Sequence, residues 1–188
     1  MLESLKQELR QMLSPRRYAH SIGVMHLSKE LARRHGCSEE KAELAGLLHD
    51  CAKELCEEQT LRILDSLGDQ VDELTRSMRS LWHAPVGAVL CREKFGIDDD
   101  EIYEAIFYHT VGKPGMKRLT EIIYIADLTE VGRDAYLPWA PAMRELAKKD
   151  LHGALIGVID RTMSSLIEQH KCIHPLTVEV RNRVLQKR

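Results

Sequence analysis

The segment AGLLHDCAKEL, residues 45–55, sets His49 and Asp50 side by side among small and apolar residues. Burying a polar group costs free energy unless it is hydrogen-bonded, and a buried charge has to be paired or bound to a metal ion. Two explanations are open from this segment alone. The pair could lie at a helix end in contact with solvent, or both side chains could bind a metal ion. The rest of the chain has to discriminate between these explanations.

The composition around this segment is that of one globular domain. The chain has 188 residues, of which 44% are hydrophobic and 30% are charged, so it can bury a substantial core. The net charge of −2 provides no general attraction to nucleic acid or to an anionic membrane. We therefore expect no nucleic-acid polymer and no membrane among its partners, and a homodimer stays open.

The cysteines and the N-terminal segment indicate the compartment. The five cysteines are scattered and form no CxxC pair, which argues against a disulfide framework and against a thiolate zinc site. The opening residues MLESLKQELRQML are charged throughout, unlike a signal peptide. No apolar run reaches the roughly 18–20 residues that span a bilayer. We therefore expect a cytoplasmic protein.

The hydrophobic periodicity is helical along almost the whole chain. It predicts a single all-α domain over residues 1–188, a compact bundle of about seven to nine helices. The core is expected over about residues 14–171 and a polar C-terminal tail over 172–188. Helices are expected over 2–13, 15–35, from Ser38 through the quoted segment, near 71–80, 82–95, 98–109 and 117–130, and twice within 141–171. Asp98 is expected to cap the helix over 98–109, because Glu101 follows at capping-box spacing.

Residues three, four and seven apart share a helix face, which separates inward from outward histidines. His26 shares a face with charged residues, His35 lies at a helix end, and His152, His170 and His174 lack comparable apolar neighbours. Five other positions lie on apolar faces, and Asp50 follows about 100° around its helix. The inward positions are His20, His49, His83, His109 and Asp127.

Together these six side chains would be costly to bury without a metal. Imidazole and carboxylate suit Fe, Mn, Co or Zn, and the absence of cysteine from the set argues against a structural zinc. Six ligands fit two ions that share a carboxylate, and Asp50 is the natural bridge because it adjoins His49. Two ions about 3.5–4 Å apart can clamp a phosphate and lower the pKa of a bridging water.

The order of these residues resembles the HD-domain metal phosphohydrolase superfamily. Five blocks are similar to its YqeK family of bacterial hydrolases: RRYAHSIGVMHLSKELARRHG, AGLLHDCAKEL, HAPVGAVL, AIFYHTVGKPGM and IIYIADLTEVGRD, within about residues 14–155. The resemblance implies a binuclear iron centre, with Mn, Co or Mg as substitutes, and cleavage of diadenosine tetraphosphate symmetrically into two ADP. It assigns His20, His49, Asp50 and Asp127 to one ion, and Asp50, His83 and His109 to the second.

In such a hydrolase a metal-bridging hydroxide attacks an inner phosphorus in line. We expect Asp50, Lys53 and Asp127 to be catalytic, with Asp127 orienting the attacking water. Lys53 follows Asp50 by three residues and so can reach a phosphate from the same face. Lys53 and four further residues are expected to bind the substrate: Thr110, Gly112, Lys113 and Arg133.

Rival functions stay open at this point. One is another HD-domain phosphohydrolase, such as a nucleotidase, a dNTPase, a (p)ppGpp hydrolase or a cyclic-dinucleotide phosphodiesterase. The phosphodiesterase is disfavoured because Tyr108 and His109 stand where that branch has paired histidines. Others are a di-iron oxygenase, which would need O₂, and a nucleotide-binding sensor that no longer hydrolyses.

Overall fold

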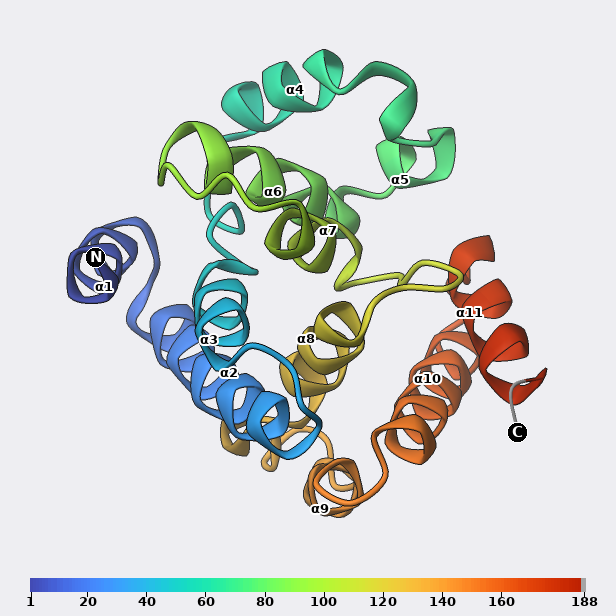
Figure 1. Ribbon diagram of the computed structural model, residues 1–188. Helices are drawn as coiled ribbons and strands as arrows, with labels where there is room; N and C mark the ends of the chain where they lie inside the picture. Colours follow the sequence, from blue (N-terminus) through green and yellow to red (C-terminus); the bar gives the residue numbers. More distant parts are fainter. Residues whose placement is uncertain (187–188) are drawn as a thin grey trace.

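The protein is entirely helical, as Figure 1 shows for the computed structural model, which describes residues 1–186. No β-strand occurs in this described part, so the predicted all-α class is confirmed. Three short 3₁₀ turns accompany the α-helices: η1 (Gly68–Gln70), η2 (Arg79–Leu81) and η3 (Val131–Arg133). The α-helices are α1 (Leu2–Met12), α2 (Pro15–Arg34), α3 (Glu39–Leu48), α4 (Glu57–Ser66), α5 (Glu73–Ser77), α6 (His83–Glu93), α7 (Asp100–Tyr108), α8 (Arg118–Thr129), α9 (Ala140–Ala147), α10 (Leu151–Glu168) and α11 (Pro175–Gln186).

The expected number of helices, about seven to nine, was too low, since residues 1–186 form eleven. The two extra helices are α4 and α11, and each buries few side chains. In α4 these are Thr60 and Leu64, and in α11 they are Thr177, Val180 and Val184. The apolar periodicity of α11 is weak, whereas α4 has a clear apolar face within only ten residues that was not assigned from the sequence.

The segment that we expected to be a polar tail therefore contains a packed helix. Helix α11 lies against α10 (Figure 1), and the Thr177 hydroxyl donates a hydrogen bond of 2.9 Å to the carbonyl of Val111. Residues 187 and 188 of that predicted tail lie outside the described residues. At the other end of the chain, Leu5 and Leu9 of α1 are buried, so the core also extends before residue 14.

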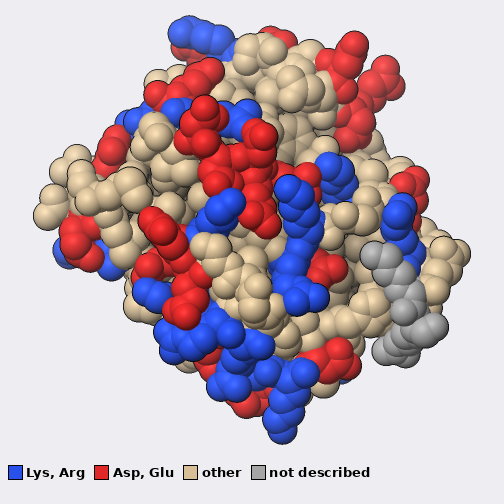
Figure 2. Space-filling model, viewed as in Figure 1, with Lys and Arg blue, Asp and Glu red and all other residues tan. Residues whose placement is uncertain are grey.

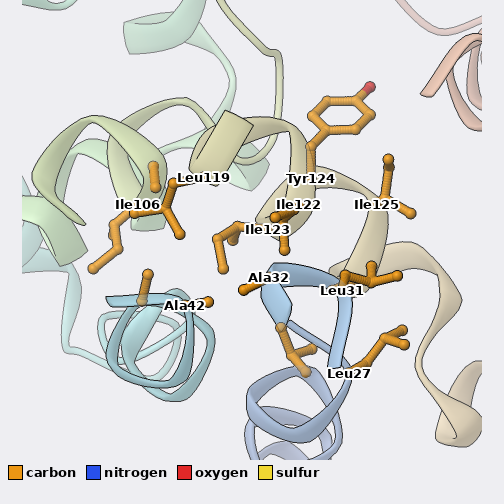
Figure 3. Close-up of a cluster of buried hydrophobic side chains, with 14 of the residues drawn as sticks. Leu27, Leu31, Ala32, Ala42, Ile106, Leu119, Ile122, Ile123, Tyr124 and Ile125 are labelled. Atoms are coloured by element: carbon orange, nitrogen blue, oxygen red, sulfur yellow. The ribbon is translucent and has the colours of Figure 1, made fainter. Parts of the chain in front are cut away.

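Helix α8 lies in the middle of the molecule, with α2 and α3 on one side and α10 on the other (Figure 1). Its residues from Leu119 to Ala126 are apolar on almost every face, as expected for a helix enclosed by others. Figure 3 shows side chains of α8 meeting those of α2, α3 and α7, among them Ile123, Leu31, Ala42 and Ile106. Because Asp127 lies on α8, this packing holds one end of the site rigidly.

Helices α2 and α3 approach closely at Gly46. A Cβ atom at this position would come within 2.9 Å of the Met25 Cα, so only glycine permits this distance. The neighbouring Ala42 and Ala45 are completely buried, in agreement with the small-residue face seen in the sequence. This close packing brings the end of α3, where His49 and Asp50 follow, next to the middle of α2, where His20 lies.

The cap of α7 differs from the predicted one, and the helices can also be checked for their ability to span a membrane. The residue that caps α7 is Asp99 and not Asp98, and its carboxylate accepts hydrogen bonds from the backbone N–H groups of Glu101 and Ile102. None of the helices in residues 1–186 has the length and apolarity needed to cross a membrane.

Candidate metal centre

The six side chains expected to bind metal come from five helices and converge in the structure. His20 lies on α2 and Asp127 on α8, and both are partly buried. The other four lie at helix ends and are buried, with His49 after α3, His83 at the start of α6 and His109 after α7. Their donor atoms form three overlapping groups within 4.8 Å: His20–His49–Asp50, His49–His109–Asp127 and Asp50–His83–His109.

Two histidine rings are oriented by hydrogen bonds to the last turn of their own helices. His49 Nδ1 lies 2.8 Å from the Gly46 carbonyl, and His109 Nδ1 lies 2.7 Å from the Ile106 carbonyl. A carbonyl oxygen only accepts, so each Nδ1 carries the proton and each Nε2 presents a lone pair to the cluster. This arrangement is the usual one for histidines that bind a metal through Nε2.

Asp50 lies between the two sets of histidines. Its Oδ1 is 3.2 Å from His83 Nε2 and 3.9 Å from His109 Nε2, whereas its Oδ2 is 4.0 Å from His49 Nε2. The two oxygens of one carboxylate thus face different donor groups. This is the arrangement that a carboxylate shared by two cations requires.

The pKa shifts show how the cluster is charged without a bound cation. Burial lowers the pKa of His109 to about 4 and also lowers the pKa of His83, so both rings are neutral at pH 7, as metal ligands are. Burial also disfavours protonation of His20, but its hydrogen bonds to Asp127 and Glu130 outweigh this and raise its pKa to about 9. A protonated His20 thereby supplies positive charge that a metal ion would otherwise provide.

The two aspartates are held in their charged form by the surrounding cations. Burial favours the neutral form of each carboxyl, yet His49 and the Lys53 ammonium beside Asp50, and the protonated His20 and Arg133 beside Asp127, bring both pKa values below the usual range. Neutral imidazole nitrogens and charged carboxylates are the donor types that bind divalent transition metals. The residues present therefore fit a metal centre.

Glu130 completes the environment of His20, and the sequence analysis did not identify it. It is buried, and its Oε1 lies 3.0 Å from His20 Nδ1 while its Oε2 accepts a hydrogen bond of 2.6 Å from the Gly132 backbone N–H. A Cβ atom on Gly23 would come within 2.3 Å of this carboxylate, and one on Gly132 within 2.7 Å. The spacing of Glu130 three residues after Asp127, on the same helix face, was the available signal.

Three cationic side chains contact the aspartates or histidines. Lys53 Nζ lies 2.9 Å from His83 Nε2 and 3.8 Å from Asp50 Oδ1. Arg133 donates from Nη2 to Asp127 Oδ1 at 2.6 Å and from Nε to the Asp127 carbonyl at 2.8 Å. Arg17, which was not anticipated, lies 3.3 Å from Asp50 Oδ2. Its position three residues before His20 on α2 was the signal for it.

The other three residues expected to bind substrate lie on the connection between α7 and α8, apart from these contacts. Lys113 pairs with Glu104 at 2.9 Å, and Gly112 packs beside Val180 with a positive φ of 76°. Thr110 lines a separate hollow of about 220 Å³ together with Tyr108, next to His109 in the chain.

The remaining histidines lie outside the cluster, as expected, although His174 is not a surface residue. His26 is exposed, and His35 Nε2 lies 2.6 Å from the Ala147 carbonyl. His174 is buried and lies 3.2 Å from both Asp72 and Thr75, which ties the start of α11 to α5. Tertiary packing buried it even though it has few apolar neighbours in the sequence.

The cluster opens to the surface on two sides. A cleft of about 610 Å³ borders His20 and is lined by Arg16, Arg17, Arg133 and Tyr136, among others. A smaller hollow of about 110 Å³ borders His83 and Lys53 on the other side. Basic and acidic side chains are interleaved over much of the face in Figure 2. The positive charge that an anionic ligand needs therefore has to come from the basic residues that line these two openings, among them Arg16, Arg17, Arg133 and Lys53.

Residues 17–132 match the model of the HD domain family. The chain is 40% identical to "Bis(5'-nucleosyl)-tetraphosphatase, symmetrical" of Bacillus subtilis (strain 168), over 90% of this chain and 89% of that one. The protein of the same name from Staphylococcus aureus is 30% identical over 96% of this chain and 93% of its own.

A solved structure is similar over the whole length. It is the crystal structure of a predicted HD superfamily hydrolase involved in NAD metabolism from Clostridium acetobutylicum, with a TM-score of 0.93 and 34% sequence identity. The match covers 100% of this chain and 98% of the clostridial one. The likeness therefore extends to α4 and α11, the two helices that the sequence patterns did not reveal.

Proposed function

The chain belongs to the HD domain family, and we propose that it is a metal-dependent hydrolase that cleaves diadenosine tetraphosphate symmetrically into two ADP. One observation carries the proposal. Asp50 lies between two sets of histidine donors, in a chain 40% identical to a symmetrical tetraphosphatase over nearly its whole length. The sequence similarity to this relative covers the helices that carry the donor residues. The activity named for the relative and the geometry of this chain therefore support the same proposal.

We assign the donors to two ions that share Asp50, and we assign iron to both on the family resemblance, with Mn, Co or Mg as substitutes. Bound together, such ions neutralise phosphate charge and lower the pKa of a water molecule. The chain positions the ligands for this task, since the Gly46 and Ile106 carbonyls and Glu130 orient three of the rings. On that resemblance the first ion would take His20, His49, Asp50 and Asp127, and the second would take Asp50, His83 and His109. The donor groups His20–His49–Asp50 and Asp50–His83–His109, each within 4.8 Å, support this assignment, as does the 3.0 Å distance from Asp127 Oδ1 to His20 Nε2.

The cationic side chains around the donors can bind the tetraphosphate. Arg133 presents a planar guanidinium suited to two phosphate oxygens, and Lys53 provides a compact charge beside Asp50. Without substrate both neutralise the aspartates. When metal cations satisfy the aspartates, these groups are released to contact phosphate. We keep Asp50, Lys53 and Asp127 as the proposed catalytic residues, with Asp127 orienting the attacking water.

The proposed roles of Thr110, Gly112 and Lys113 apply to a different side of the cluster. These residues lie on the connection that follows His109, so they can contact only a part of the substrate that extends past the second ion. Three broader expectations also stay predictions: that the chain is a single domain, that it is cytoplasmic, and that it forms a homodimer.

The experiment that tests the function is product analysis with metal-loaded protein. Water attacks an inner phosphorus, the bond from that phosphorus to the central bridging oxygen breaks, and each half departs as ADP. In ¹⁸O-labelled water one of every two ADP molecules should carry the label on its β-phosphate. Formation of AMP and ATP would contradict the symmetrical reaction. Release of inorganic phosphate or pyrophosphate from mononucleotides at a higher kcat/KM would favour another HD-domain phosphohydrolase, and consumption of O₂ would favour an oxygenase.

A further inference from the structure

We propose that the cleft beside His20 binds one of the two nucleoside diphosphate halves of the substrate, and that the Tyr136 ring is the surface on which its base stacks. This inference rests on the proposed function and adds a nucleoside subsite to it. The cleft has a volume of about 610 Å³, which is within the usual range for small-molecule sites. It is also continuous with the metal cluster, because His20 belongs to both.

The symmetry of the substrate requires two such subsites. A molecule cut at its centre has its reacting phosphorus beside the metal ions, so the two nucleoside diphosphates extend from the cluster in different directions. The cluster opens past His20 into the large cleft and past His83 and Lys53 into the smaller hollow. One half of the substrate therefore has to lie in the cleft on the His20 side.

The charges in the cleft follow the order of groups in a nucleoside diphosphate. Arg17 and Arg133 lie beside Asp50 and Asp127, where the phosphates would be. Arg16 and Tyr136 lie at the exposed rim, with the guanidinium carbon of Arg16 5.0 Å from the centre of the ring. Phosphate-binding groups thus lie inside, and an aromatic surface lies outside.

The two acidic residues of the cleft do not oppose an anionic ligand strongly. Glu130 uses both carboxylate oxygens, on His20 Nδ1 and on the Gly132 backbone N–H. Glu54 accepts a hydrogen bond from the Ser14 backbone N–H at 2.5 Å and lies 3.6 Å from Arg17 Nε. Both carboxylates are therefore partnered within the protein.

The exposure of Tyr136 is the second argument. Single exposed apolar side chains are common, but apolar side chains that gather beside a cleft indicate a ligand-binding surface. Tyr136 is 62% exposed and Val131 is 70% exposed, and both lie on the short segment that also carries Arg133. A base has an apolar face and can stack on a tyrosine or on a guanidinium plane.

The segment that carries Tyr136 is held in place, so little ordering is needed on binding. The backbone N–H of Tyr136 donates to the Arg133 carbonyl at 2.9 Å, and so does that of Leu137 at 2.8 Å. Asp134 pairs with both terminal nitrogens of Arg144 at 2.9 Å. A stacking surface fixed in this way binds a base at a lower entropic cost than a mobile loop would.

The test compares Tyr136→Ala and Tyr136→Phe with the wild type, all loaded with metal. The substrates are diadenosine tetraphosphate and adenosine 5′-tetraphosphate, which has the same phosphate chain and one nucleoside. Loss of one base-stacking surface should raise KM for the dinucleotide roughly 5- to 150-fold and leave kcat within about twofold. Adenosine 5′-tetraphosphate can place its nucleoside on the other side, so its KM should change little.

Binding without turnover provides the second readout. Calorimetry with the analogue that has a methylene group in place of the central bridging oxygen should show the same rise in Kd for Tyr136→Ala, whereas Tyr136→Phe should bind like the wild type. Arg92→Ala, which removes a guanidinium stacked 4.2 Å from the Tyr103 ring at a different site, is the matched control and should have no effect.

The outcomes separate the subsite from the function. An unchanged KM and Kd in Tyr136→Ala, or equal losses in Tyr136→Phe and Tyr136→Ala, would overturn the stacking role. A lower kcat on both substrates with an unchanged KM would also overturn it. A wild type that makes no ADP but binds the analogue through Tyr136 would refute the proposed function and leave the nucleoside subsite in place.

Discussion

Replacing Glu130 with glutamine is expected to weaken metal binding about 10- to 100-fold and to leave the fold intact. The carboxylate accepts from two donors, His20 Nδ1 at 3.0 Å and the Gly132 backbone N–H at 2.6 Å. An amide has a single oxygen, so it can accept from one of these donors and must turn its NH₂ group toward the other. It cannot rotate away, because Gly23 and Gly132 pack directly against the carboxylate.

The magnitude follows from this geometry. Losing a hydrogen bond to a buried charged group costs about 1.5–3 kcal/mol. If the hydrogen bond to His20 is the one lost, the ring is no longer held with Nε2 facing the cluster. The full free-energy cost of that hydrogen bond then appears in the metal-binding constant. Since 1.4 kcal/mol corresponds to about a factor of ten, the expected change is about 10- to 100-fold. If the loss falls on Gly132, the η3 turn and Arg133 shift, and metal affinity changes little while substrate affinity falls.

The assay is competitive titration of metal-free protein with Mn²⁺ or Co²⁺ against a chromophoric chelator, together with a thermal melt of the metal-free form. Glu43→Gln is the control, because Glu43 is a partly buried carboxylate that is also paired, with Lys29 at 3.0 Å, but does not contact the cluster. Metal affinity in Glu130→Gln equal to that of the wild type, with unchanged substrate affinity, would refute the positioning role. An equal loss in Glu43→Gln would show that the effect is general destabilisation.

Three further predictions concern the cluster itself. Lys53→Ala should keep its metal and lose roughly 10- to 1,000-fold in kcat/KM, and an unchanged value would place Lys53 outside the reaction. His20→Ala should lose metal in elemental analysis while His26→Ala should not, because only His20 faces the cluster; equal losses would contradict this assignment. In the metal-free protein the raised pKa of His20, about 9 against an ordinary 6.5, stabilises the fold fully below pH 6.5, and that contribution should fade as pH rises through 9. A thermal melting temperature that stays constant or rises over that range, after correction with a His20→Ala reference, would argue against the charge pairing.

The sequence was most informative where the relevant property is local. Each donor residue was found from its position relative to apolar neighbours on one helix, and that relationship depends only on the 3.6-residue turn. The same local signal was weak for α11, which buries three side chains in a polar segment, whereas the apolar face of the short helix α4 was present but was not assigned. It also placed the start of α7 one residue early, because Asp98 and Asp99 are both suitable caps and only the helix geometry selects Asp99.

Local spacing could show that Glu130 and Arg17 share helix faces with donor residues, but not which groups of other helices they contact. Glu130 and His20 are 110 residues apart in the chain, and no periodicity within one helix links them. Arg17 shares a face of α2 with His20, but its contact with Asp50 of another part of the chain does not follow from the periodicity of α2. The assignment of Thr110, Gly112 and Lys113 to the substrate stays a prediction, and the pairing of Lys113 with Glu104 is a further contact that the loop's composition does not predict.

What the sequence alone determined is therefore the all-α class and the identity of the six inward polar residues, because amphipathic periodicity is a property of a single helix. Tertiary structure decided which of those helices meet, that Asp50 turns one oxygen toward each set of histidines, and that Arg16 and Tyr136 stand at the rim of the cleft. These features depend on the close approach of α2 and α3 at Gly46 and on the enclosure of α8. Such packing is fixed by shape complementarity between segments far apart in the chain, which single-helix periodicity does not encode.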